Sequence, residues 1–193
     1  MELLINKIRK DGAALNAKVL LVDTFLNHQV DVPLMQEVGR EFARLFGDAG
    51  ITRVVTIEAS GIAPAAFAAL ELGVPLVIMK KNHSAVLSEG TLSVPVASFT
   101  KGTTYPLTLK TKFVTPGDNV LIIDDFLANG EAALGAVKLV EMASGTVGGI
   151  GIVIEKSFQP GRQRLIDAGH EPVSLARIKR METGVIEFVP EGE

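Results

Sequence analysis

The stretch that decides the fold is residues 120–132, VLIIDDFLANGEA. It starts with four aliphatic residues, as in a strand that is buried on both faces of a parallel sheet. Asp124 and Asp125 follow at the carboxyl end of the expected strand, which is the edge where open α/β sheets place ligands. Ala128 to Ala132 then lead into an expected helix, whose N-terminus and preceding backbone N–H groups can receive a phosphate. This order of residues predicts two carboxylates that bind the vicinal hydroxyls of a sugar, next to a pocket for its phosphate.

Each of these residues taken alone also fits a purely structural role. Asp and Asn are common at helix N-termini, and carboxylates there complement the helix dipole. Two carboxylates, an apolar pair and then Ala-Asn-Gly are a rarer combination. The ligand-binding interpretation is therefore favoured, provided that a strand and a helix flank the loop.

Strand and helix signals alternate along the rest of the chain. Pro33, after Asp31, opens a helix with an apolar stripe formed by Leu34, Met35, Val38, Phe42, Leu45 and Phe46. Strand, helix and strand in succession imply right-handed parallel crossovers. We therefore expect an α/β fold with a mostly parallel twisted sheet flanked by helices. Helices are expected at 1–10, 33–46, 64–72 and 131–143, and strands at 53–59, 74–79, 120–123, 148–154, 173–178 and 184–189.

The segment from 81 to 106 has the weakest pattern and is expected to be the most mobile part. Residues 81–96 show no clear period, and 98–110 predict a polar hairpin around Lys101-Gly102. Closing over a bound anion, this segment would exclude water.

Composition sets the bounds of the protein class. A chain of 193 residues fits a single domain with an adequate core, and its net charge of −3 lacks the basic excess of nucleic-acid binders. The chain has no cysteine, and its N-terminus resembles neither a signal peptide nor a membrane span, so a cytoplasmic location is expected. The apolar content of 47% leaves room for a hydrophobic dimer face.

A second anion site is expected near the first. Ser60-Gly61 follows one expected strand and precedes a helix, so its backbone N–H groups can meet an anion; a plain turn explains it equally well. Lys80 and Lys81 end the next strand at the same edge, where a lysine suits an anion, although a solvated charge is the commoner case. His28, His83 and His170 lack metal-ligand spacing, so no protein metal site is expected.

The 120–132 stretch resembles the phosphoribosyl-diphosphate signature of type I phosphoribosyltransferases. Residues 20–29 (LLVDTFLNHQ), 58–64 (EASGIAP) and 155–162 (EKSFQPGR) extend this resemblance to the bacterial xanthine phosphoribosyltransferases. The resemblance implies the type I fold, with a small hood subdomain from about 1–32 and the C-terminal part. It also implies a homodimer that salvages xanthine as xanthosine 5'-monophosphate, with Mg²⁺ carried by phosphoribosyl diphosphate.

The resemblance also assigns roles to individual residues. Asp124 and Asp125 hold the ribose near the positive charge that grows on the ring, and the turn at Ser60 and Gly61, with Lys81, contacts pyrophosphate. The resemblance implies that xanthine is contacted by Leu20, Asn27 and Lys156, and that phosphoribosyl diphosphate is bound by Ala128, Asn129, Gly130, Glu131 and Ala132. Phe158 is added to the xanthine contacts because its ring can stack on a base.

The choice of base is expected to depend on Lys156. An ammonium only donates hydrogen bonds, so it suits a keto oxygen at the purine 6-position and disfavours an amino group. A salt bridge with Glu155 is the alternative, disfavoured because neighbours in a strand face opposite ways. Phe158 either stacks on the base or belongs to the core. Asn27 offers both donor and acceptor, whereas Leu20 supplies only apolar packing.

Two departures from the wider superfamily qualify the assignment. Glu131 places a carboxylate where a phosphate must dock, so its side chain is expected to point away. Ala128 stands where hypoxanthine-guanine enzymes carry an acid, so no general acid or base is assigned. Another purine phosphoribosyltransferase, for hypoxanthine-guanine or adenine, and a phosphoribosyl-diphosphate-sensing regulator are the alternatives. The regulator ranks lower because the chain lacks a basic face.

Overall fold

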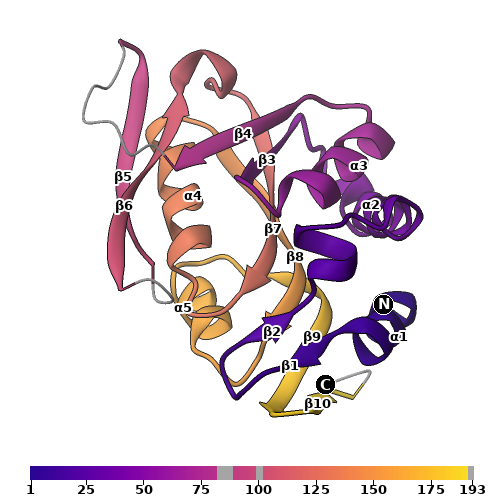
Figure 1. Cartoon of the computed structure of the whole chain (residues 1–193). Coiled ribbons are helices and arrows are strands. Elements are labelled where there is room, and N and C mark those ends of the chain that lie inside the picture. Colours follow the sequence, from indigo (N-terminus) through magenta and orange to yellow (C-terminus); the bar gives the residue numbers. More distant parts are fainter. Residues whose placement is uncertain (82–88, 99–101, 191–193) are drawn as a thin grey trace.

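The computed structural model describes residues 1–81, 89–98 and 102–190. Within these residues the main sheet has the strand order β10-β9-β8-β7-β3-β4-β6-β5. The strands from β9 to β4 run parallel to their neighbours, whereas β10, β6 and β5 pair antiparallel. The expected α/β fold with a mostly parallel sheet is therefore confirmed (Figure 1).

The strands of this sheet are β3 (Arg53–Ile57), β4 (Leu76–Lys81), β5 (Thr91–Ser98), β6 (Thr103–Lys110), β7 (Asn119–Leu127), β8 (Thr146–Lys156), β9 (Val173–Glu182) and β10 (Val185–Phe188). The α-helices are α1 (Glu2–Asp11), α2 (Val32–Phe46), α3 (Ile62–Leu72), α4 (Glu131–Met142) and α5 (Gly161–Asp167). The short elements are β1 (Ala13–Ala14), paired with β2 (Leu20–Leu21), a π-helical turn η1 (Asp23–Asn27), and 3-10 turns η2 (Gly47–Ala49) and η3 (Thr111–Phe113).

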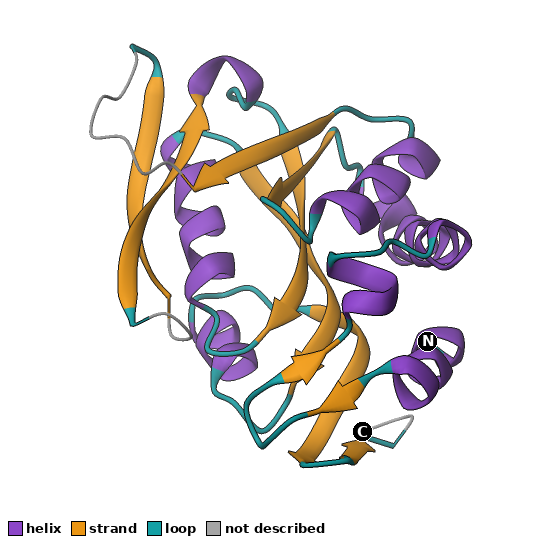
Figure 2. Cartoon of the chain, in the orientation of Figure 1, coloured by secondary structure: helices purple, strands orange, loops and turns teal. Residues whose placement is uncertain are grey.

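Helices cover both faces of the sheet (Figure 2). Strand alternation divides the core, because successive side chains point to opposite faces. Val54 and Leu121 belong to the hydrophobic cluster with α1, α2 and α3, whereas their chain neighbours Val55 and Val120 belong to the cluster with α4 and α5. The strands are buried on both sides, which explains their continuous aliphatic runs.

The hairpin of β5 and β6 differs from the expectation. Its strand β5 starts at Thr91, within the segment where no period was recognised, and the hairpin is not purely polar. Val94, Val96 and Leu107 are buried, and a Cβ at Gly135 of α4 would lie 2.7 Å from Val96 Cγ2. The hairpin therefore covers α4. Of the segment 81–106 expected to be mobile, residues 82–88 and 99–101 lie outside the described residues.

Two further expectations need adjustment. The stripe of α2 excludes Leu45, whose side chain is 38% exposed, and includes Gly39 instead. A Cβ at Gly39 would lie 2.5 Å from Phe67 Cβ, so the glycine allows α2 and α3 to approach closely. The strand β7 also continues through both aspartates to Leu127, pairing with β8 after its pairing with β3 has ended at Ile123.

Candidate active site

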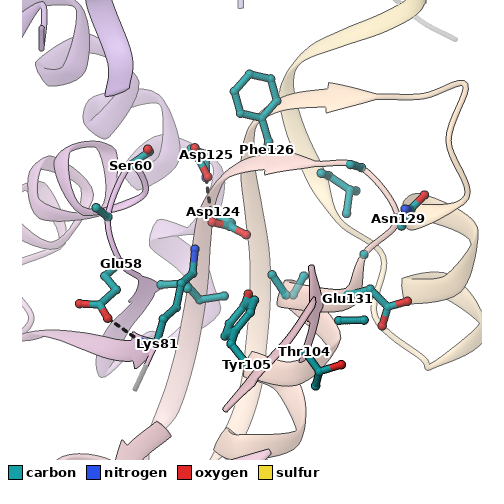
Figure 3. Close-up of a pocket in the computed structure, with 18 of the residues that line it drawn as sticks. Glu58, Ser60, Lys81, Thr104, Tyr105, Asp124, Asp125, Phe126, Asn129 and Glu131 are labelled. Carbon is teal, nitrogen blue, oxygen red and sulfur yellow. Dashed lines mark hydrogen bonds between the residues drawn. The ribbon is translucent and has the colours of Figure 1, made fainter. Parts of the chain in front are cut away.

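A cavity of about 590 Å³ opens at the carboxyl ends of β3 and β7, where the sequence predicted a site. The loop before α4 forms one wall, and the end of β4 with the β5-β6 hairpin forms the opposite wall (Figure 3). The lining includes the expected residues Ser60, Lys81, Asp124, Asp125, Ala128, Asn129, Gly130, Glu131 and Ala132. It also includes Glu58, Thr104, Tyr105 and Phe126, which sequence reasoning had not assigned to the anion or sugar.

The Asp124 side chain is buried and bonded to the backbone of its neighbour Asp125. Asp124 is 6% exposed, and its Oδ1 accepts a hydrogen bond from the backbone N–H of Asp125 at 3.1 Å. Burial, and then the charge of Asp125, raises the pKa of the Asp124 carboxyl well above its ordinary value. Asp124 therefore holds a proton more readily than an ordinary aspartate does.

Lys81 and Tyr105 approach Asp124 from the hairpin side of the cavity (Figure 3). The Lys81 ammonium lies 5.5 Å from the centre of the Tyr105 ring. Burial, and then the Asp124 charge, raises the pKa of the Tyr105 hydroxyl, so it stays a hydrogen-bond donor. The site thus combines a cation and a hydroxyl donor opposite the acidic pair.

Glu58 fixes the end of β4 beside the Ser60 turn. Its carboxylate accepts hydrogen bonds from the Lys81 backbone N–H at 2.6 Å and from Lys80 Nζ at 3.1 Å. The Lys80 side chain therefore forms an ion pair with Glu58, whereas the Lys81 side chain lines the cavity. The strand-end rule that selected Ser60 would also have selected Glu58, two residues earlier.

The turn at Ser60 and Gly61 approaches Asp124 closely. The peptide bond between Glu58 and Ala59 is cis. A Cβ at Gly61 would lie 2.4 Å from Thr56 Oγ1 and 3.4 Å from Asp124 Oδ1, so only glycine fits there without displacing its neighbours. Gly61 itself does not line the cavity, and Ser60 does.

The loop from Ala128 to Ala132 is shaped by two glycines. Gly130 has a φ of +84°, which favours glycine, and its Cα is packed against Gly161 at the start of α5. The Gly161 backbone N–H donates to the Ala128 carbonyl at 2.9 Å. The first turn of α4 then begins at Glu131, so the loop and helix N-terminus face the cavity together, as expected.

Glu131 points away from Asp124 and Tyr105 (Figure 3), as the sequence analysis predicted. Its carboxylate forms an ion pair with Arg164 of α5, with Oε1 and Nη1 2.6 Å apart. The same Nη1 donates to the Asn129 carbonyl at 2.7 Å. Sequence reasoning missed Arg164, because nothing in the local pattern of α5 points to a loop that lies 33 residues earlier.

None of the four residues expected to contact the base lines this cavity. Lys156, at the end of β8, donates from Nζ to the Lys18 carbonyl at 2.5 Å and lies 5.3 Å from the centre of the Phe126 ring. Burial lowers the pKa of the Lys156 ammonium. Phe126 lines the cavity and thus connects it with Lys156.

The other three base-contact candidates differ in exposure. Leu20 is buried in the core, whereas Asn27 in η1 is exposed. Phe158 is 41% exposed, which rules out the core role that the sequence left open. Their contact with the base stays a prediction.

Glu155 has partners other than Lys156, as strand alternation predicted. It is 1% exposed and accepts hydrogen bonds from Arg162 Nε at 2.9 Å, from Ser157 Oγ at 2.7 Å and from Ser174 Oγ. Burial alone would raise the pKa of Glu155, but these hydrogen bonds outweigh it and lower the pKa. The buried carboxylate holds the turn that follows Lys156.

Neither a protein-bound metal cluster nor a membrane-spanning helix is found in the described part of the chain. Across residues 1–81, 89–98 and 102–190, no group of three or more Asp, Glu or His side chains is arranged to hold a metal ion. None of the helices in those ranges is long and apolar enough to cross a membrane.

Comparison with known proteins identifies the class to which this fold and site belong. The family model described as the phosphoribosyl transferase domain matches residues 32–168, and the chain belongs to this phosphoribosyltransferase family. In solved structures, an adenine phosphoribosyltransferase from Rhodothermus marinus matches with a TM-score of 0.74 at 24% identity, over 92% of this chain and 100% of that one. One from Thermoanaerobacter pseudethanolicus has a TM-score of 0.67 at 29% identity, over 76% and 82%. These likenesses confirm the type I fold.

Curated relatives give a narrower assignment within the family. The xanthine phosphoribosyltransferase 1 of Clostridium botulinum is 55% identical over 98% of this chain and 100% of its own length. The xanthine phosphoribosyltransferase of Pseudomonas putida is 51% identical over the same shares of the two chains. That of Lactococcus lactis is 52% identical over 98% of this chain and 96% of its own. The resemblance stated from the sequence is therefore confirmed.

Proposed function

We propose that this protein transfers the 5-phosphoribosyl group from phosphoribosyl diphosphate to xanthine, giving xanthosine 5'-monophosphate and pyrophosphate in purine salvage. The observation that carries the proposal is the acidic pair at the sheet edge, which shares one cavity with a glycine-shaped loop at a helix N-terminus. Relatives named xanthine phosphoribosyltransferase, at 51–55% identity over nearly the whole chain, support the choice of base.

The loop from Ala128 to Ala132 is proposed to bind the 5'-phosphate. It precedes α4, so backbone N–H groups and the positive end of the helix dipole favour an anion there. The left-handed Gly130 and its packing against Gly161 fix the path of the loop before the ligand arrives. A preformed loop loses little conformational entropy on binding.

Asp124 and Asp125 are proposed to hold the ribose hydroxyls. Displacement of pyrophosphate by a ring nitrogen of the base passes through a transition state with positive charge on the ribose. A carboxylate in a buried site stabilises that charge more strongly than one in water. No residue needs to act as nucleophile, so the chemistry depends on positioning and charge.

Ser60, Gly61 and Lys81 are proposed to receive the pyrophosphate. Lys81 supplies a cation from the wall opposite the phosphate loop, and Glu58 fixes the backbone that carries it. Mg²⁺ belongs to the same proposal as an ion bound to the oxygens of the diphosphate, because it prefers phosphate oxygens and water to a full set of protein ligands. Arriving on the diphosphate, it would help to neutralise the charge of the leaving group.

Lys156 is proposed to select the base, with Leu20, Asn27 and Phe158 completing the site from the hood. The ammonium is partly desolvated and already donates to a carbonyl, that of Lys18. A keto oxygen of xanthine would present the same kind of acceptor, whereas the amino group of adenine would place donors against donors.

The decisive experiment measures product formation from phosphoribosyl diphosphate with xanthine, guanine, hypoxanthine and adenine in turn. Xanthine is expected to have the largest kcat/KM. Lys156→Ala is expected to lose most of this preference, whereas Asp124→Asn mainly lowers turnover. Lys138→Ala, which removes an exposed lysine on α4, is the matched control. A preference for adenine would overturn the proposal.

Adenine is the second candidate base, because the solved structures with the likenesses reported above are adenine phosphoribosyltransferases. The same four-base comparison separates the two candidates. Their identities of 24% and 29% are well below the 51–55% of the xanthine-named relatives, so xanthine is favoured.

A cytoplasmic homodimer is the proposed form of the enzyme. Large apolar side chains are exposed on the single chain, among them Leu70 at 68% and Val32 at 56%, and a partner copy would cover apolar surface of this kind. The lack of cysteine fits a reducing compartment. Light scattering at micromolar concentration is expected to give twice the mass of the chain; the monomer mass would contradict the dimer.

A further inference from the structure

We propose that Arg164 is a positioning residue for phosphoribosyl diphosphate, because it holds the Glu131 carboxylate out of the phosphate pocket. This inference rests on the proposed function, in particular on the assignment of the loop from Ala128 to Ala132. It concerns a residue of α5 that lines no part of the cavity.

The Glu131 carboxylate is an anion of the protein itself that could occupy the proposed phosphate site. Glu131 is the first residue of α4, and it lines the cavity that the substrate phosphate must enter. A carboxylate at this position is attracted by the same helix N-terminus that attracts the phosphate. Left free, Glu131 would compete with the phosphate for the backbone N–H groups and repel its negative charge.

The geometry shows how the competition is avoided. Arg164 Nη1 lies 2.6 Å from Glu131 Oε1 and 2.7 Å from the Asn129 carbonyl oxygen. One guanidinium nitrogen therefore holds both the carboxylate and the backbone of the loop. The Glu131 side chain turns away from Asp124 as a result (Figure 3).

Arg164 belongs to α5, and the start of this helix is bonded to the same loop. The Gly161 backbone N–H donates to the Ala128 carbonyl at 2.9 Å, and a Cβ at Gly130 would lie 3.2 Å from the Gly161 Cα. The start of α5 is thus in close contact with the loop, and Arg164 follows one turn later. An ion pair of this exposure contributes little to stability, with Arg164 and Glu131 39% and 37% exposed. Its expected effect is on ligand binding.

The test measures the Kd of phosphoribosyl diphosphate with Mg²⁺, by calorimetry in the absence of base, for the intact protein and its variants. Arg164→Ala is expected to raise this Kd about tenfold, because it frees a charge beside the bound phosphate. Arg164→Lys keeps a cation and is expected to lose less. In steady-state assays the change is expected in the KM for phosphoribosyl diphosphate and not in the KM for xanthine.

The double variants separate this role from a merely structural one. Adding Glu131→Gln or Glu131→Ala to Arg164→Ala is expected to restore most of the affinity, because the competing charge is gone. A structural loss would not be repaired by a second truncation. Arg44→Ala is the matched control, since Arg44 pairs with Glu41 on the exposed face of α2.

Two results would contradict the inference, and they differ from a failure of the proposed function. If the wild-type protein binds phosphoribosyl diphosphate and Arg164→Ala binds it equally well, Arg164 has no positioning role. If the double variants bind as weakly as Arg164→Ala, Glu131 is not the competing anion. Absence of binding by the wild-type protein would instead refute the assignment of the loop.

Discussion

Gly161→Ala tests whether the contact between α5 and the phosphate loop sets the geometry of the site. A Cβ at position 161 would lie 2.4 Å from the Ala128 carbonyl oxygen, 2.8 Å from Leu127 Cδ1 and 3.0 Å from the Gly130 backbone nitrogen. Two of these atoms belong to backbone and cannot rotate away. The loop and the start of α5 must therefore separate by several tenths of an ångström.

The energetic cost follows from two opposing effects. Overpacking costs about 1–3 kcal/mol, and alanine is about 1 kcal/mol better than glycine within a helix. The net loss of stability is expected to be between zero and about 2 kcal/mol. In a domain of this size each kcal/mol lowers the Tm by about 2–4 °C, so the Tm is expected to fall by up to about 8 °C.

The same displacement is expected to weaken binding. Moving the Ala128 and Gly130 backbone away from its position lengthens the hydrogen bonds from the groups proposed to receive the phosphate, so the Kd is expected to rise by about tenfold. The assay combines a thermal melt with the Kd of phosphoribosyl diphosphate. The matched control is Gly47→Ala, where a Cβ would meet no atom within 4 Å and φ is −59°.

The control is expected to leave affinity unchanged and to raise stability slightly, by about 0.5 kcal/mol. If Gly161→Ala keeps both the wild-type Tm and the wild-type Kd, the close contact between α5 and the loop is refuted. If the Tm falls while the Kd stays the same, the contact exists but does not set the phosphate site.

Three further predictions concern charge and capping. Asp124→Asn is expected to raise the Tm at neutral pH, because the fold disfavours the ionised Asp124 carboxylate and this cost sets in above the ordinary pKa of an aspartate, where the unfolded chain ionises; the raised pKa of Asp124 gives the direction. The gain should vanish in acid, below the ordinary pKa of an aspartate; a gain independent of pH would contradict it. Glu155→Gln is expected to cost about 3 kcal/mol at neutral pH, because it leaves Arg162 without its buried partner. Since the pKa of Glu155 is lowered in the fold, this difference should shrink as the pH falls through that pKa, which a pH series of urea melts would show. Asp31→Ala is expected to cost about 1 kcal/mol by thermal melt, because Asp31 Oδ1 caps α2 through the Leu34 N–H; an unchanged Tm would show that the cap is dispensable.

Local pattern was sufficient for most of the fold. The aliphatic run before Asp124 predicted a strand buried on both faces, and the small residues after it predicted a turn into a helix; both are present in β7 and α4. The strand β5 was not predicted from the sequence. The alternation of Val94 and Val96 is explained only by their packing against Gly135 of α4. An isolated strand pattern of this length is ambiguous until its packing partner is known.

The candidate site divides in the same way. Which groups stand at the ends of the strands can be predicted from the amino-acid order, because each strand and its following turn are encoded by adjacent residues. Which distant groups meet them, such as Arg164 at Glu131 and Tyr105 beside Lys81, depends on the packing of the folded chain. Such contacts join residues far apart in the chain, and they are fixed by how helices and hairpin pack on the sheet, which no local propensity encodes.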